Sequence, residues 1–167
     1  LYRQYLNYRP DDVSAYAEVA LVEVGLARQP ASTSRNIRAA YEALEEAVRN
    51  VPTRDDLRRL LVEFQMMPNI QRFADARDNL QVLISHSPAD PDLQLLLAQC
   101  YEHGRYWDEA RQICERLVGF DSSKQEFDAR RATDPREVQA YTILAHNLRR
   151  RLGHSTAADA TMQRLVE

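Results

Sequence analysis

Four histidines are the side chains best suited to binding a metal or moving a proton: His86, His103, His146 and His154. No two of them stand three or four residues apart, the spacing that places two imidazoles on one helix face. The 4 glycines are scattered singly, so no Gly-rich phosphate loop is present, and no serine lies in an elbow motif. The sequence therefore predicts no catalytic residue, no metal site and no cofactor.

Two further groups have alternative interpretations. The run Arg149–Arg151 could bind an anion, or it could offset the dipole at a helix end. Cys100 and Cys114 could be small buried hydrophobic residues, or they could form a disulfide if their geometry allowed one. For both groups we favour the structural interpretation.

The amino-acid composition argues against two further classes of function. The 167 residues suit one domain, and 22 basic residues against 25 acidic ones give a net charge of −3. This balance argues against general nucleic-acid binding, which depends on neutralising phosphates. No apolar run approaches the roughly 20 residues of a membrane span, so we predict no membrane insertion. The first residues lack both a secretory signal layout and an initiator methionine, so we expect a piece of a longer protein, and the compartment stays open.

The elements that would position these residues follow a repeat of 34 residues. Asp75-Ala76 corresponds to Glu109-Ala110, and Phe73 corresponds to Trp107. This period is typical of stacked helix-turn-helix units, which expose an extended surface suited to another polypeptide.

Apolar residues recur at helical spacing between prolines that mark the unit boundaries. The first unit is expected to hold helices at about 12–28 and 34–50. Alanines would let paired helices approach closely, and larger side chains there would clash. The alanines with this predicted role are Ala20, Ala98 and Ala145 on first helices and Ala40, Ala76, Ala110 and Ala158 on second helices.

The pattern resembles the tetratricopeptide repeat family. Leu97-Ala98-Gln99-Cys100-Tyr101 and Gly104 to Ala110 carry the best match, and Tyr41 to Ala47 with Val51-Pro52 carries another. The resemblance implies an all-α, right-handed solenoid of antiparallel helical hairpins with about nine helices. We predict a single domain over 1–167, with a half repeat at 1–10 and repeats at 11–52, 53–88, 89–122 and 135–167.

The longest departure from the family pattern lies between the third and fourth repeats. Arg116-Leu117-Val118 recurs as Arg164-Leu165-Val166, 48 residues later and about 14 more than the family period. The inserted segment, 119–134, contains Phe120 and Phe127. We predict that these two rings fold the segment against its neighbours; a mobile recognition arm is the alternative.

The resemblance also implies a concave groove lined by the first helices. It is expected to be apolar in the first repeat and mixed polar later, which suits a peptide or helix with apolar anchors at one end. It lacks the basic and Asn array of the members that clamp chaperone tails. The groove residues predicted from the family alignment are Ala17, Leu21, Arg58, Val62, Gln65, Leu95, Gln99, Glu102, Thr142, His146 and Arg149.

The sequence thus predicts a non-enzymatic scaffold or adaptor that binds an unknown protein or peptide. The alternative is a structural or self-association module without a dedicated peptide ligand, because exposed terminal helices would allow homo-oligomers.

Overall fold

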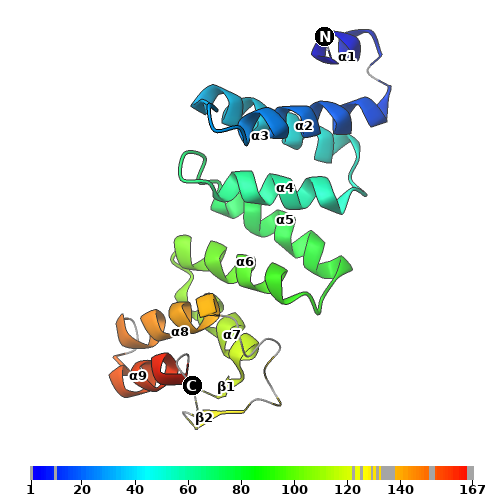
Figure 1. Cartoon of the computed structure of the whole chain (residues 1–167). Helices are drawn as coiled ribbons and strands as arrows, with labels where there is room; N and C mark the ends of the chain where they lie inside the picture. Colours follow the sequence, from blue (N-terminus) through cyan, green and yellow to red (C-terminus); the bar gives the residue numbers. More distant parts are fainter. Residues whose placement is uncertain are drawn as a thin grey trace. The chain divides into compact units, whose positions relative to one another are not determined.

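A computed structural model describes residues 2–9, 11–121, 123–124, 126–128, 130, 132, 138–150 and 153–164 (Figure 1). These residues form nine helices and one two-stranded sheet. The chain divides into two compact units, residues 1–79 and 80–167, and the division falls inside α5. The elements are α1 (Tyr2–Tyr8), α2 (Val13–Ala27), α3 (Ser34–Asn50), α4 (Asp55–Met66), α5 (Phe73–His86), α6 (Pro91–His103), α7 (Trp107–Val118), β1 (Phe120–Asp121), β2 (Glu126–Phe127), α8 (Val138–Arg150) and α9 (Ser155–Arg164).

In unit 1, α2 and α3 form an antiparallel hairpin, and α1 and α4 pack against it. The side chain of Asp12 caps α2 by accepting from the amide of Ala15. Thr33 and Asn36 form a reciprocal capping box at the start of α3. These caps explain why α3 begins at Ser34, as predicted, and why α2 begins at Val13, one residue after the predicted start. Pro10 lies outside the described residues.

In unit 2, α6 pairs with α7 and α8 pairs with α9, while α7 also packs on α8. The carboxylate of Asp90 caps α6, and Pro91 occupies its first turn, where a missing amide proton costs nothing. The aromatic ring of Tyr141 lies in the core built by these helices.

The predicted close-packing role of the alanines is confirmed by their burial. Ala20, Ala40, Ala76, Ala98 and Ala110 are 0% exposed, Ala158 is 1% exposed and Ala145 is 7% exposed.

The inserted segment begins with a short hairpin that the sequence did not predict. Phe120 pairs with Phe127 across β1 and β2. Their ring centroids are 4.9 Å apart, and the Phe127 ring lies 5.9 Å from that of Tyr141 on α8. The expectation that both rings fold the segment against its neighbours is therefore confirmed for its described part.

Gly119 makes the hairpin possible. It ends α7 with a φ of +74°, and a Cβ there would lie 2.3 Å from the carbonyl oxygen of Asp128. The amide of Asp128 donates to the carbonyl of Gly119 at 2.8 Å. Only glycine accommodates both the left-handed conformation and this close approach.

Candidate functional site

The first helices of the two hairpins in unit 2 are α6 and α8. We call their solvent-exposed surface the inner face of unit 2. Two polar contacts join these helices. The Gln99 amide donates to the side-chain oxygen of Gln139, and His146 Nδ1 lies 3.2 Å from Glu102 Oε1. The predicted residues Gln99, Glu102 and His146 are thus brought together on one surface.

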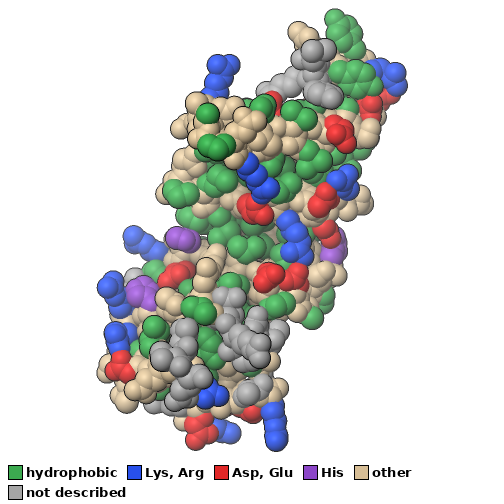
Figure 2. Space-filling model, in the orientation of Figure 1, with side chains coloured by type: hydrophobic (Ala, Val, Ile, Leu, Met, Phe, Trp, Pro, Cys, Tyr) green, Lys and Arg blue, Asp and Glu red, His purple; other side chains and the backbone are tan. Residues whose placement is uncertain are grey.

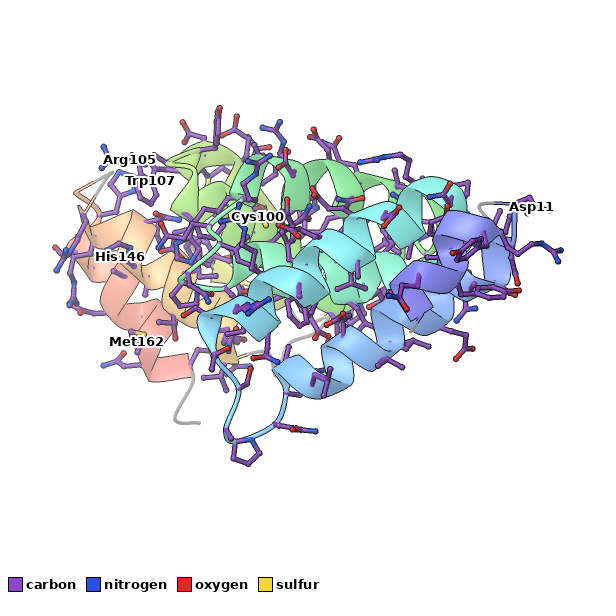
Figure 3. All side chains as sticks on the ribbon, turned by 90° about the horizontal axis from the view of Figure 1, so that it is seen from above. Asp11, Cys100, Arg105, Trp107, His146 and Met162 are labelled. Carbon is purple, nitrogen blue, oxygen red and sulfur yellow. The ribbon has the colours of Figure 1, made fainter. Side chains whose placement is uncertain are left out.

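The Glu102–His146 contact depends on protonation of the imidazole. The side chain of His146 is 36% exposed and that of Glu102 is 25% exposed, so both reach the solvent. Figure 3 labels His146 on α8. The Nδ1 atom of His146 is itself buried and makes no hydrogen bond with the described residues, so the contact is an ion pair only when the imidazole is charged.

Three other predicted residues lie near this face. Thr142 is exposed, and its hydroxyl donates to the carbonyl of Val138 at 3.0 Å within α8. Arg149 is exposed and pairs with Asp159 of α9. Leu95 is 9% exposed and belongs to the core rather than to the surface.

In unit 1, the side chains predicted on α4 lie toward α5 instead of solvent. Val62 is 0% exposed and Gln65 is 1% exposed. Asn79 of α5 contacts Arg58 at 2.8 Å and Gln65 at 3.2 Å, which places both residues on the α5 side of α4. Arg58 also donates to the carbonyl of Pro52. Val62 and Gln65 therefore have almost no surface to offer a ligand.

The exposed residues of α4 are Asp56, Arg59 and Glu63, which sequence reasoning missed. The spacing between the helix starts would have identified them. The helix α6 begins at Pro91 and α4 at Asp55, so equivalent residues lie 91 − 55 = 36 positions apart. Subtracting 36 from Gln99 gives Glu63, not Val62 or Gln65. The alignment that predicted the groove residues did not apply this spacing to the second repeat.

On α2, the two predicted residues differ in exposure. Ala17 is 4% exposed, whereas Leu21 is 39% exposed and available for contact. Arg28, just after α2, pairs with Glu63 of α4 at 2.6 Å. The inner face of unit 1, comprising Leu21 with the exposed residues of α4, thus combines an apolar side chain with several charges.

One family model matches part of the chain. The family model described as tetratricopeptide repeat matches residues 71–132. No curated protein has a significant sequence match to the chain.

Solved structures of similar fold cover nearly the whole chain. A crystal structure of MamA is 17% identical, with a TM-score of 0.70 over 99% of this chain and 82% of that one. Another MamA structure is 18% identical, with a TM-score of 0.68 over 99% and 77%. The MamA 41-end structure from Desulfovibrio magneticus RS-1 is 14% identical, with a TM-score of 0.68 over 99% and 80%. These identities show the fold alone, and the predicted all-α helical-repeat fold is confirmed.

Tetratricopeptide repeats are typically non-enzymatic protein-interaction or scaffold modules. Within the described part of the chain, no three His, Cys, Asp or Glu side chains cluster as a metal site. Cys100 and His103 do stand three residues apart on α6, but Cys100 is 3% exposed while His103 is exposed to solvent. No helix in the described ranges is both long and apolar enough to span a bilayer.

Both cysteines are buried thiols, as their interpretation as small hydrophobic residues predicted. Burial raises the pKa of the Cys114 thiol to about 12, with smaller contributions from the Glu102 and Glu115 carboxylates. Burial in the core thus keeps this thiol protonated and unreactive at neutral pH.

Proposed function

We propose that the chain is a non-enzymatic adaptor that binds a peptide or helix along the inner faces of its first helices. The observation that carries this proposal is the connected polar surface of unit 2. Gln99 and Glu102 on α6 reach Gln139 and His146 on α8, so adjacent first helices present one continuous, partly exposed strip.

This strip suits peptide recognition because its side chains are mainly neutral donors and acceptors. Glutamine, threonine and histidine can bond to the main chain of an extended or helical ligand without demanding a particular charge. Their contacts across α6 and α8 hold their rotamers, which reduces the entropy lost when a ligand binds.

The test uses a phage-displayed random peptide library panned on the whole chain. Enriched peptides are then measured against Thr142→Trp, which places a large ring in the middle of the strip. The matched control is Gln112→Trp, at an exposed position on α7. We expect Thr142→Trp to weaken binding by about tenfold or more and Gln112→Trp to leave it unchanged. Equal binding by both variants would place the ligand elsewhere.

A second candidate is a self-association module without a peptide ligand. Exposed hydrophobic side chains on α1 and α2 favour it, including Tyr8 at 84% and Val22 at 44% exposure. Light scattering over a range of concentrations separates the two functions: a stable monomer that binds peptides supports the adaptor, and a concentration-dependent dimer without peptide binding supports self-association.

A further inference from the structure

One carboxylate on the inner face of unit 2 has no permanently charged partner among the described residues. Glu102 makes no hydrogen bond with any of them, and its ionic contact is the imidazole of His146, 3.2 Å away. Arg149 on the same face differs, because it is already paired with Asp159 of α9. The negative charge of Glu102 is therefore balanced only while the imidazole is protonated.

The burial of this pair makes the missing partner costly. The side chain of Glu102 is only 25% exposed, so most of it is withdrawn from water. The Nδ1 atom of His146 is buried and also lacks a hydrogen bond with the described residues. Polar atoms that have lost water without gaining a partner are unfavourable, and a ligand group that pairs with them recovers part of that cost.

The ionisable groups around the imidazole are mostly paired with one another. The helix α8 packs against α6, α7 and α9. The groups that these helices and α8 contribute include Glu102 and His103 on α6, Cys114 and Glu115 on α7, Arg149 and Arg150 on α8, and Asp159 on α9. Glu115 pairs with Arg111 at 2.7 Å, Arg149 pairs with Asp159, and the thiol is protonated. His103 and Arg150 are exposed to solvent. Glu102 is thus the carboxylate of this described set whose counter-charge changes with pH.

No broad patch of one charge covers the face of the molecule drawn in Figure 2, among the residues coloured by type. Acidic and basic side chains are interspersed there with hydrophobic ones. The net charge of −3 is also small for 167 residues. A charged ligand is therefore selected by single groups rather than by an extended field.

We propose that Glu102 binds an arginine or lysine side chain of the peptide ligand, and that His146 competes with that side chain for the carboxylate. A guanidinium can donate two parallel hydrogen bonds to a carboxylate, which favours arginine. A protonated imidazole occupies Glu102 and repels the incoming cation, whereas a neutral one leaves the carboxylate available. Because histidines gain their charge between about pH 8 and pH 5, binding weakens as pH falls through this range. Glu102 can select a basic residue only if the inner face binds a peptide, so this assignment rests on the proposed function.

The test uses peptides selected on the whole chain from the random library at about pH 8. One selected peptide is synthesised with its arginine and again with citrulline, an uncharged analogue of the same shape. Fluorescence anisotropy measures both peptides at about pH 8 and about pH 5.5. We expect wild type to bind the arginine peptide about tenfold more tightly than the citrulline peptide at the higher pH, and about threefold or more weakly at the lower pH than at the higher.

Two variants separate the roles of the carboxylate and the imidazole. Glu102→Gln should bind the arginine and citrulline peptides equally, because the selecting charge is gone. His146→Gln should keep the preference for arginine but bind equally at both pH values. His154→Gln is the matched control, since His154 is exposed and lies before α9, and it should behave like wild type.

Urea unfolding tests the Glu102–His146 contact without a ligand. At about pH 5.5, Glu102→Gln and His146→Gln should each lower the unfolding midpoint, and the double variant should lower it no further. At about pH 8, His146→Gln should leave the midpoint almost unchanged. Effects that simply add at both pH values would show that the two side chains do not interact, and would overturn the competition. Circular dichroism of each variant confirms that it folds.

The outcomes also separate this assignment from the proposed function. Selected peptides that Thr142→Trp weakens, but that lack basic residues or bind equally with citrulline, would overturn the role of Glu102 and leave the adaptor function standing. A pH dependence that persists in His146→Gln would overturn the role of His146. No selected peptides, or peptides that Thr142→Trp leaves unaffected, would overturn the assignment and the proposed function together.

Discussion

The two units join their neighbouring first helices by different chemistry. In unit 1, α2 and α4 are connected by the ion pair between Arg28 and Glu63, whose side chains are 54% and 51% exposed. In unit 2, α6 and α8 are connected by the Gln99–Gln139 hydrogen bond and the Glu102–His146 contact. The same packing of alanines underlies both, so the core is common to the units while the inner face is free to vary.

The largest loss of stability is expected at the buried alanines, which both units share. Ala40→Leu in unit 1 and Ala110→Leu in unit 2 should each cost about 1–3 kcal/mol, because both sites are 0% exposed and the larger side chain must displace packed neighbours. Thermal unfolding should show a fall of several degrees for both. The control, Ala160→Leu, lies at an exposed position on α9 and should leave the melting temperature almost unchanged. A normal melting temperature for either buried variant would break the equivalence of the two cores.

Alkaline pH should act on unit 1 through Tyr41. Burial, and then the hydrogen bond to Glu45, raise the pKa of Tyr41 to about 12 from an ordinary value near 10. The folded state therefore favours the neutral phenol, and its contribution to stability is complete below pH 10 and lost as pH rises through about 12. Denaturant unfolding at stepped pH should show this loss in wild type and less of it in Tyr41→Phe. An identical pH dependence in both would remove Tyr41 as its source.

A smaller effect is expected for the neutral contact of unit 2. Gln139→Ala should cost about 0.5 kcal/mol by removing the acceptor of the Gln99 amide on a surface open to water. Because neither partner is charged, this cost should be the same in low and high salt. A cost that disappears in high salt would mean that charges, not this hydrogen bond, dominate the contact.

The smallest effect is expected for the ion pair of unit 1. Glu63→Gln should cost only about 0.2 kcal/mol, at the low end for exposed ion pairs, since both partners are about half exposed. The cost should vanish near 1 M salt, where the Debye length falls to about 3 Å. Measuring Gln139→Ala and Glu63→Gln in low and high salt therefore compares the neutral contact of unit 2 with the charged contact of unit 1.

The sequence predicted the helices well where local signals and tertiary packing agree. For α3, the capping residues, the apolar period and the closing Val51-Pro52 all indicate the same boundaries. The hairpin of β1 and β2 could not be predicted in this way, because two-residue strands carry no period. Its aromatic contacts were still foreseen from Phe120 and Phe127.

The inner face was predicted less well because it depends on register. A shift along a helix by one residue rotates a side chain by about 100°. Such a rotation separates the buried Val62 from the exposed Glu63. The single-domain organisation over 1–167 and the ligand-binding role of the groove residues stay predictions.

The buried cysteines have a practical consequence for spectroscopy. Cys100 and Cys114 are 3% and 0% exposed, so native thiols should not compete for a maleimide dye. A cysteine introduced at Gln112 on α7 and another at an exposed position on α3 would take labels on an otherwise natural background. Energy transfer between such dyes could then follow the two units in solution without the removal of any native residue.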